Sequence, residues 1–412
     1  MIGGGSIAGT WTSVMTAQPP ELQALHLFRE TYGAAPEFLA RAPGRVELLG
    51  NHTDYNGGFV LAVAIDRYTA VAGRSVSGGR GRIRSAAFGH DDFPVDDPER
   101  GAPGAWERYV RGVVWSLGVR AGFEASLAGD VPLGAGLSSS ASLQAALATF
   151  LIASGACAEP DSDDRRPDAV RMTLARALQR SENEFVGVSS GLLDQFTVLF
   201  GREGESLLLD CRSLAFERLP LGHPPPAIVV CDSKTSRRLA DGMYNRRRAE
   251  CETVVDHFRR LRGPDAVRWL RDVSLEDLTA DWDALDPVGR LRARHVLTEN
   301  ARVIDGAAAL RRGDLATFGR LMSASHSSSR DDFANSAPAL DALIASAERS
   351  PGFLGGKLSG AGWAGCTVNL VAIDSADAFA SSVSSEFSRL TGHVPDIHVC
   401  RSADGAGVVP IS

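Results

Sequence analysis

The hydrophobic pattern of this chain switches repeatedly between two periods, and this switching constrains the fold more than any single motif. Continuous or alternating apolar runs, typical of strands, occupy residues 58–65, 67–73, 205–209, 226–231 and 366–373. Apolar residues spaced three and four apart, typical of helices, occupy residues 20–32, 105–117, 140–155, 170–186, 243–262, 295–311, 314–325, 338–348 and 376–390. Because both periods recur along the whole chain, the sequence predicts a protein of mixed helix and sheet.

The length of the chain, 412 residues, is enough for two or three domains. The segment 1–20 has no charged n-region and no sustained apolar stretch, so we expect it to be a flexible leader, with the true start near Met15. The Pro-rich stretch "LGHPPPA" at 221–227 is a reasonable boundary between two halves. We therefore expect one domain over 21–220 and a second over 221–412.

The charge and cysteine content exclude several classes of protein. A net charge of −7 gives no general basic surface for nucleic acid or anionic lipid. No apolar run approaches the ~18 residues that span a bilayer, and the N-terminus lacks the features of a secretory signal. The six cysteines are scattered, with no CxxC pair, which argues against a disulfide framework or a zinc site. We expect a cytoplasmic protein without nucleic-acid or membrane partners.

The strongest local motif is "GDVPLGAGLSSSASLQAAL", residues 129–147. Gly134 and Gly136 permit a tight loop whose backbone N–H groups can approach an anion. Ser138, Ser139 and Ser140 then stand where a helix begins, and helix N-termini favour phosphate. A simple serine N-cap would produce a similar pattern. The combination favours a phosphate-binding loop, which is neither a Walker A loop nor a dinucleotide fingerprint.

Two carboxylates follow in "QRSENEFVGVSSGLLDQFTVLFG", residues 179–201. Asp194 has apolar neighbours, and a carboxylate in such a setting is paired, hydrogen-bonded or functional. The alternative is that Asp194 only caps a helix. Glu182 lies in a helical stretch, and together with a Ser hydroxyl it would suit Mg²⁺, which takes few protein ligands beside phosphate oxygens.

The segment "RAPGRVELLGNHTDYNGG", residues 41–58, carries a different chemistry. Asn51, His52 and Asp54 form a compact set of donors and acceptors suited to sugar hydroxyls. Arg45 is a permanent cation able to stand beside a phosphate or to keep a carboxylate ionised. The alternative is an Asn/Asp turn leading into a hairpin, with "YNGG" as the turn. A further Gly-rich stretch, 355–370, indicates either a close backbone approach to a ligand or a crowded packing point.

Together these stretches resemble the galactokinase branch of the GHMP small-molecule kinase family. The segment "PGRVELLGNHTDYNGG" resembles that family's sugar-binding segment, and "PLGAGLSSSAS" its phosphate loop. The stretches "SENEFVGVSSGLLDQF", "MYNRRRAEC", "RHVLTENARV", "SHSSSRDDFANSAPALDAL" and "LSGAGWAGCTVNLV" resemble further family segments, in the same order from about residue 24 to the C-terminus. The resemblance implies an α+β fold of two closely packed domains with the active site in the interdomain cleft.

The resemblance also implies a role for each matching residue in an ATP-dependent sugar 1-kinase. Asp194 would be the base facing the anomeric hydroxyl of D-galactose or a close analogue, with Arg45 as the neighbouring cation. Mg²⁺ would be bound by Ser140 and Glu182. The ATP phosphates would lie against Gly134, Ala135, Gly136, Leu137, Ser138, Ser139 and Ser140, and Trp106 would lie on the nucleotide side. The sugar would contact Glu47, Asn51, His52, Asp54, Gly191 and Tyr244.

One departure from the family pattern bears on the choice of sugar. The family reads GRVNLIGEHTDY, with Glu where this chain has Asn51 and Asn where it has Glu47. The family's Glu accepts a hydrogen bond from the C6 hydroxyl of galactose. Asn51 can still accept through its carbonyl oxygen, but it is uncharged. Galacturonate, L-arabinose or an amino- or deoxy-galactose therefore become alternative substrates, and Asn51→Glu is expected to shift preference toward galactose.

Two rival functions have weaker support. A non-catalytic sensor that binds sugar and ATP would lack part of the Ser-Ala sequence of the phosphate loop, yet "SSSA" is complete here and Asp194 is present. Another GHMP branch, such as a mevalonate or homoserine kinase, would not explain "GNHTDYNGG" or "YNRRRAEC". We expect the partners to be a sugar and ATP, and the protein to be a monomer or a weak homo-oligomer.

Overall fold

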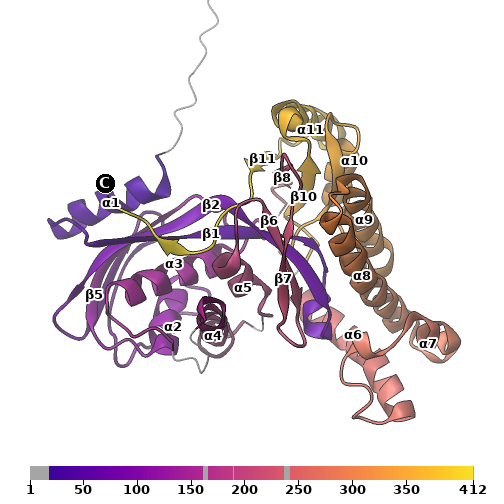
Figure 1. The fold of residues 1–412 in the computed structure, drawn as a ribbon, viewed down its shortest axis with the longest axis horizontal. Helices are drawn as coiled ribbons and strands as arrows, with labels where there is room; N and C mark the ends of the chain where they lie inside the picture. Colours follow the sequence, from indigo (N-terminus) through magenta and orange to yellow (C-terminus); the bar gives the residue numbers. More distant parts are fainter. Residues whose placement is uncertain (1–17, 161–165, 189, 236–241, 412) are drawn as a thin grey trace, which may run out of the picture.

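Two antiparallel-rich sheets and the helices that cover them form two lobes (Figure 1). The computed structural model describes residues 18–160, 166–188, 190–235 and 242–411. The larger sheet has the order β12-β1-β2-β5-β3-β4, with β6 paired to β2 and β7 to β6. The smaller sheet has the order β11-β8-β10-β9. Of the strand pairs in these sheets, β3 and β5 run parallel and the others antiparallel. The mixture of helix and sheet agrees with the sequence prediction.

The strands of the larger sheet come almost entirely from the first half of the chain. They are β1 (Phe38–Leu49), β2 (Phe59–Val76), β3 (Arg80–Ser85), β4 (Gly89–Pro94), β5 (Gly122–Gly129), β6 (Glu205–Asp210), β7 (Phe216–Pro220) and the C-terminal β12 (Gly407–Val408). The smaller sheet consists of β8 (Ala227–Asp232), β9 (Phe353–Leu358), β10 (Cys366–Val371) and β11 (Asp396–Cys400).

The helices divide between the two lobes in the same way. The first lobe carries α1 (Pro20–Tyr32), α2 (Glu107–Leu117), α3 (Ser139–Ala153), α4 (Pro167–Arg180) and α5 (Leu193–Phe200). The second carries α6 (Met243–Arg262), α7 (Leu275–Ala280), α8 (Pro287–Arg311), α9 (Leu315–Ser328), α10 (Pro338–Ala347) and α11 (Ala376–Thr391). Figure 1 shows α1 on one face of the larger sheet and α2, α3 and α4 beyond the opposite face.

Strand β2 differs from the prediction of two separate strands at 58–65 and 67–73. It is one strand of 18 residues that pairs with β6 in its first part and with β5 in its last part. Its register against β1 shifts between Pro43 and Gly44, where Asp66 and Arg67 have no paired residue. The shift is a bulge, and a bulge bends a strand without ending it. Asp66 and Arg67, where one predicted strand was expected to end and the next to begin, therefore mark a bend within a single strand.

Strand β1 was not predicted from the pattern at all. Its sequence, FLARAPGRVELL, contains Pro, Gly, two Arg and Glu, all unusual in a strand interior. All but two of its residues are nevertheless buried. The polar side chains in the second half of β1 are buried because they face a cavity between the lobes, described below. The unusual sequence of this strand is therefore explained by the cavity that it lines.

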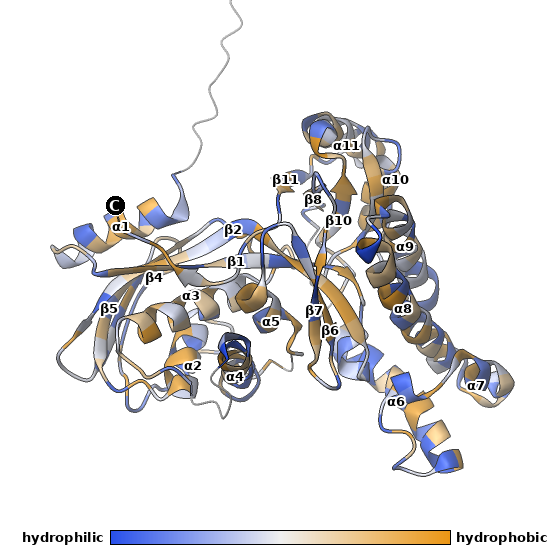
Figure 2. Ribbon diagram, viewed as in Figure 1, coloured by the Kyte–Doolittle hydropathy of each residue, from blue (hydrophilic) through white to orange (hydrophobic). Residues whose placement is uncertain are grey.

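The buried hydrophobic residues form several clusters, one of which spans both lobes. One cluster lies between the larger sheet and α3, which is apolar on most sides and carries the fully buried Leu147 and Phe150. A second cluster joins β1 and β2 to β8, β10, α8 and α9, and includes Leu48, Val230 and Met322. Figure 2 shows the hydrophobic colouring of β6 beside this region, whereas α4, at the periphery, is largely hydrophilic.

The chain changes sheets between β7 and β8, at the Pro-rich segment predicted as a boundary. We propose 221–412 as the second domain on this basis, although its last strand, β12, returns to pair with β1. Helix α1 already begins at Pro20, and the rest of the predicted leader, except Gln18 and Pro19, lies outside the described residues. Within the described ranges, no helix has the length and apolar character needed to cross a bilayer.

Candidate active site

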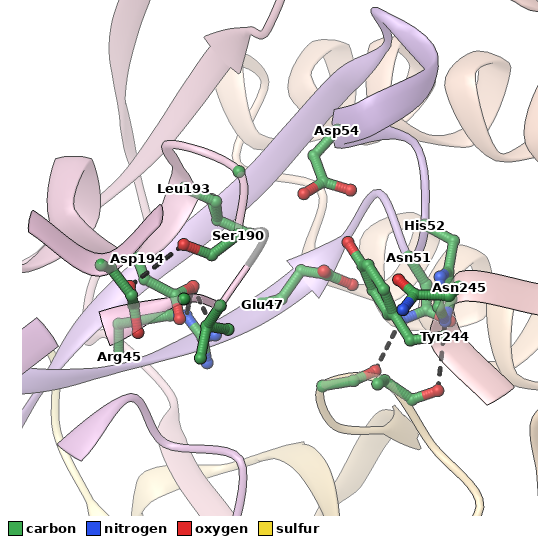
Figure 3. A pocket seen from close by; sticks show the side chains of 16 residues that line it. Arg45, Glu47, Asn51, His52, Asp54, Ser190, Leu193, Asp194, Tyr244 and Asn245 are labelled. Atoms are coloured by element: carbon green, nitrogen blue, oxygen red, sulfur yellow. Dashed lines mark hydrogen bonds and ion pairs between the residues drawn. The ribbon is translucent and has the colours of Figure 1, made fainter. Parts of the chain in front are cut away.

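A cavity of about 560 Å³ lies where the two lobes meet (Figure 3). Its walls come from β1, from the loop after it, from the segment before α5, from the start of α6 and from the Gly-rich loop after β9. The lining residues are Arg45, Glu47, Asn51, His52, Asp54, Glu182, Gly187, Val188, Ser190, Gly191, Leu193, Asp194, Tyr244, Asn245, Gly360 and Ala361. Figure 3 shows Arg45 and Asp194 at one end, Asn51, His52 and Tyr244 at the other, and Glu47 between them.

At the first end, an ion pair holds Asp194 in a fixed orientation. Arg45 donates to Oδ1 from Nε at 2.9 Å and from a terminal nitrogen at 2.5 Å, while Ser138 Oγ donates to Oδ2 at 2.6 Å. The other terminal nitrogen of Arg45 donates to the carbonyl of Gly136 at 2.7 Å. Because two N–H groups occupy the lone pairs of Oδ1, Oδ2 is the oxygen with room for a further bond.

Asp194 lies in the first turn of α5 and makes no side-chain cap bond to that helix. The alternative of a purely capping Asp therefore does not describe its contacts. Its partners come from a strand and a loop far away in sequence, and its side chain remains about a quarter exposed toward the cavity. An oriented and accessible carboxylate is suited to receive a proton.

The loop before α3 has the geometry of an anion site. Gly134 and Gly136 have φ of 74° and 75°, and Ser138, the N-cap, has φ of 55°. Non-glycine residues rarely adopt this left-handed conformation, and they do so more often at functional sites. The first turn of α3 contains no acidic residue and receives no side-chain cap bond, so its N–H groups remain available to an anion. The N–H of Arg45 donates to the carbonyl of Leu137, which fixes the loop to β1.

Glu182 stands beside this helix N-terminus. Ser140 Oγ donates to its Oε1 at 3.3 Å, Ser190 Oγ donates to its Oε2 at 3.1 Å, and Gln195 also donates to Oε2. Burial first, and then the nearby Asp194, raises the pKa of this carboxyl. No cation of the described residues is among the main influences on it.

A divalent cation would fit this position. Ser140 and Glu182 offer a hydroxyl and a carboxylate oxygen next to the phosphate loop, the donor set that Mg²⁺ takes when nucleotide phosphates supply further oxygens. Within the described ranges, no three His, Cys, Asp or Glu side chains gather into a metal cluster, so a metal held by protein alone has no such group to bind it. A metal shared with phosphate needs fewer protein ligands.

Asp54 and Gly191 form another wall of the cavity. A Cβ atom on Gly191 would lie 2.4 Å from Asp54 Oδ2, so only glycine permits this close approach. Burial raises the pKa of Asp54 to about 6. Tyr244, from the start of α6, packs its ring 5.3 Å from that of Tyr55, and burial raises the pKa of its hydroxyl.

His52 has φ of 60°, and its ring packs against that of Phe333 with centroids 4.5 Å apart. Its Nε2 faces the carbonyl of Ala361 at 3.1 Å, so Nε2 carries the proton and Nδ1 accepts from the Tyr55 hydroxyl at 2.9 Å. Burial lowers the pKa of His52 to about 3, which keeps the ring neutral at physiological pH. The ring therefore serves as a fixed, uncharged wall.

Asn51 is 2% exposed and connects the two halves of the chain. Its Nδ2 donates to the carbonyl of Gly360 at 2.8 Å. Its Oδ1 accepts from Asn335 Nδ2 at 2.9 Å and from Ser329 Oγ at 3.4 Å. These bonds occupy both lone pairs of Oδ1. The role of Asn51 as an acceptor for the sugar stays a prediction, and in this structure its Oδ1 is bonded within the protein.

A buried carboxylate behind the cavity holds the same segment in place. Glu299, fully buried in α8, accepts from the N–H groups of Gly50 and Asn51 and from Ser325 Oγ, and it pairs with Arg302 at 2.6 Å. The Arg302 guanidinium is the largest influence opposing its burial, and the pKa of Glu299 falls to about 2. It therefore remains ionised and fixes the end of β1.

Most of the residues singled out in the sequence meet in this cavity or at its edge. Trp106 does not line it. It precedes α2 and stacks on Phe88 with ring centroids 6.1 Å apart, so its place on a nucleotide side stays a prediction. The sequence analysis missed several residues: Ser138 as a partner of Asp194, and Asn245, Glu299, Lys357, Gly360 and Ala361. The Gly-rich stretch 355–370 was the available signal for the last three.

The chain is similar to known proteins along most of its length. A galactokinase galactose-binding signature matches residues 26–75, and models of the GHMP kinase N-terminal and C-terminal domains match 108–202 and 307–389. A galactokinase of Roseiflexus is 44% identical over 93% of this chain and 95% of its own length. Human galactokinase is 39% identical over 94% of this chain and 96% of its own length.

Solved structures show the same relationship. Lactococcus lactis galactokinase, in complex with galactose, superposes with a TM-score of 0.84 at 31% identity, over 93% of this chain and 98% of its own. A mevalonate kinase shares the fold, with a TM-score of 0.60 at 16% identity over 89% of this chain and 100% of its own. The chain therefore belongs to the galactokinase branch of the GHMP kinase family and is an ATP-dependent sugar kinase of the galactokinase type.

Proposed function

We propose that this enzyme transfers the γ-phosphoryl group of ATP to the anomeric hydroxyl of D-galactose, with Asp194 as the base. The observation that carries this proposal is the Arg45–Asp194–Ser138 cluster. It places an oriented carboxylate in the cavity beside the N-terminus of a helix suited to phosphate. Phosphoryl transfer depends mainly on such positioning and on neutralising charge.

In the proposed reaction, the anomeric oxygen attacks the γ-phosphorus as its proton passes to Oδ2 of Asp194. The bond from the γ-phosphorus to the β–γ bridging oxygen breaks, and ADP leaves. Arg45 holds Oδ1 with two N–H bonds, so the carboxylate keeps its orientation before and during the transfer. Because proton transfer accompanies a loose transition state, Asp194 does not need to be strongly basic.

The ATP phosphates would lie against residues 134–140, with the N–H groups at the start of α3 directed at them. Ser140 and Glu182 would hold Mg²⁺, which neutralises phosphate charge when it is bound. Glu182 fits this role because its buried carboxylate accepts from the neutral donors Ser140, Ser190 and Gln195.

The sugar would occupy the remainder of the cavity. Asp54 and the backbone around Gly191 offer acceptors for its hydroxyls, and Tyr244 and His52 enclose it. The relatives named above are galactokinases, so the comparisons do not favour galacturonate, L-arabinose or an amino- or deoxy-galactose. They do not favour a non-catalytic sensor either, and the Ser-Ser-Ser-Ala loop and Asp194 are both present.

A coupled assay of ATP consumption tests the substrate directly. Galactose, galacturonate, L-arabinose, glucose and N-acetylgalactosamine are compared at equal concentration, and the position of the new phosphate is established by NMR. We expect galactose to give the highest kcat/KM and the phosphate to be on C1. Strong turnover of glucose with none of galactose, or phosphate on another carbon, would contradict the proposal.

A further inference from the structure

Four carboxylates line the cavity, and three of them already have a role in the proposed function. Asp194 faces the reacting hydroxyl, Glu182 faces the metal, and Asp54 lies against Gly191. The fourth, Glu47, lies on β1 between the reacting end and the Asn51 end of the cavity (Figure 3). Arg45 and Glu47 are alternate residues of one strand and therefore share its cavity face.

Glu47 is held by a cation that comes from the other half of the chain. Lys357 Nζ donates to Glu47 Oε1 at 2.9 Å, and Lys357 is fully buried. The second oxygen, Oε2, receives no hydrogen bond from the described residues and is not among their buried unpartnered atoms. One oxygen is therefore fixed by Lys357, and the other is available to a ligand in the cavity.

The neighbouring amide cannot provide the same acceptor. Gly360 O is only an acceptor, so the Asn51 atom facing it is the nitrogen. Asn335 Nδ2 also faces the carbonyl of Ala361, which fixes the Asn335 amide and turns Asn51 Oδ1 toward it. The remaining polar capacity of Asn51 is a single N–H. Asn51 thus fastens the sugar segment to the Gly-rich loop.

We propose that Glu47 is the acceptor for the C6 hydroxyl of the sugar, and that Lys357 is the positioning residue that orients it. The proposal rests on the function proposed above. Relative to the family pattern, the carboxylate moves from position 51 to position 47, and the amide moves the opposite way. The enzyme thereby keeps one carboxylate on this wall, with Lys357 to balance its charge and Asn51 to hold the loop.

If Glu47 is the acceptor, Asn51→Glu should not by itself favour galactose, contrary to the simpler expectation from the family pattern. A carboxylate at 51 would face the carbonyl of Gly360 without a proton to donate, and it would bring a second negative charge near Glu47. We therefore expect Asn51→Glu alone to weaken galactose use. Only the double exchange, Glu47→Asn with Asn51→Glu, is expected to recover part of it.

The test compares galactose with 6-deoxygalactose, which lacks the C6 hydroxyl. The wild-type enzyme is assayed first, because failure to phosphorylate galactose at all would overturn the proposed function rather than this inference. In Glu47→Gln, kcat/KM for galactose is expected to fall ~10-fold or more through KM, the effect of losing a bond to a charged group. We expect the value for 6-deoxygalactose to stay within about 2-fold, and KM for ATP to stay unchanged.

Lys357 is tested by its coupling to Glu47. Lys357→Met should lower the preference for galactose over 6-deoxygalactose, and Lys357→Arg should restore part of it. If a single variant fails to fold, the double variant Glu47→Gln/Lys357→Met removes both charges together and is assayed instead. It should equalise the two sugars. A Glu47 variant that slows both sugars equally, or one that keeps the preference for galactose, would overturn the proposal.

Discussion

The two ends of the cavity are built in opposite ways. At the reacting end, Asp194, Arg45 and Ser138 meet through charge-assisted bonds, and all three come from the first lobe. At the far end, the side chains of Asn51 and His52 donate to carbonyl groups of the Gly-rich loop from the second lobe, while the buried Glu299 accepts from the Asn51 backbone. The first end keeps a charge ready for chemistry, whereas the second joins the lobes around the sugar.

The difference indicates what a substitution at each end should change. A change at the reacting end removes charge or a proton acceptor, so it should appear in kcat. A change at the far end alters how the sugar is held, so it should appear in KM for the sugar. The experiments below test this division, beginning with the largest expected effect.

Asp194→Asn should abolish most of the turnover while leaving the sugar site intact. The amide keeps the shape of the side chain but cannot receive the proton, so kcat should fall by ~10³-fold, within the usual range for a general base. Steady-state kinetics and calorimetric binding of galactose measure the two effects. Asp283→Asn, a fully exposed carboxylate far from the cavity, is the matched control. Full activity in Asp194→Asn would remove Asp194 from the mechanism.

Glu182→Gln should impair the use of Mg²⁺ without affecting the binding of galactose. Losing the charge while keeping the shape should raise the Mg²⁺ concentration for half-maximal rate and lower kcat by ~10²-fold, with KM for galactose unchanged. A titration of rate against Mg²⁺ at saturating ATP measures the shift. Glu184→Gln changes an exposed carboxylate of the same turn and should behave as wild type. An unaltered Mg²⁺ dependence in Glu182→Gln would refute the metal assignment.

The reacting end was also the more predictable from sequence. Asp194, Arg45, Glu182 and the loop before α3 lie in short motifs that resemble those of the galactokinase family, so they were candidates from the sequence, and their roles stay predictions. The link between Ser138 and Asp194 could not be predicted from the sequence, because it depends on how α5 packs beside α3.

The far end was harder to predict because its bonds cross the whole chain. The Asn51 amide pairs with residues 278 to 309 positions away, and the Glu47–Lys357 pair spans 310 positions. The same limit applies to the fold. The long helices α6 and α9 follow their hydrophobic period closely, but β1 is concealed by polar residues that face the cavity.

Gly191→Ala should damage the sugar side without removing any functional group. The new Cβ would lie 2.4 Å from Asp54 Oδ2, so the carboxylate or the loop must move. Loss of one well-placed bond to a charged group should raise KM for galactose ~10-fold, with a smaller effect on kcat. The control is Gly79→Ala, where a Cβ would meet no atom within 4 Å. An equal loss in kcat with no change in KM for galactose would contradict the expectation that the reacting end affects kcat and the sugar side affects KM.

Substitution of Asp54 should produce the smallest effect, a change in thermal stability. Its pKa is raised by burial from 3.8 to about 6, so the sugar-free fold favours the neutral acid. That contribution to stability is fully present below pH 3.8 and is lost as the pH rises through about 6. Asp54→Asn removes the charge and should melt ~2–4 °C above wild type at pH 7.5, with the gap closing near pH 4.

Once galactose is present, the higher melting temperature expected for Asp54→Asn should be reversed in favour of the wild type. The ionised carboxylate gains hydrogen bonds from sugar hydroxyls, so galactose should raise the melting temperature of the wild type more than that of Asp54→Asn at pH 7.5. Thermal melts of the wild type and Asp54→Asn near pH 4 and at pH 7.5, with and without galactose, measure these differences in melting temperature. A gap between the two proteins that does not vary with pH would mean that the charge of Asp54 is not the source of the instability, and that the wall around Gly191 is held by shape alone.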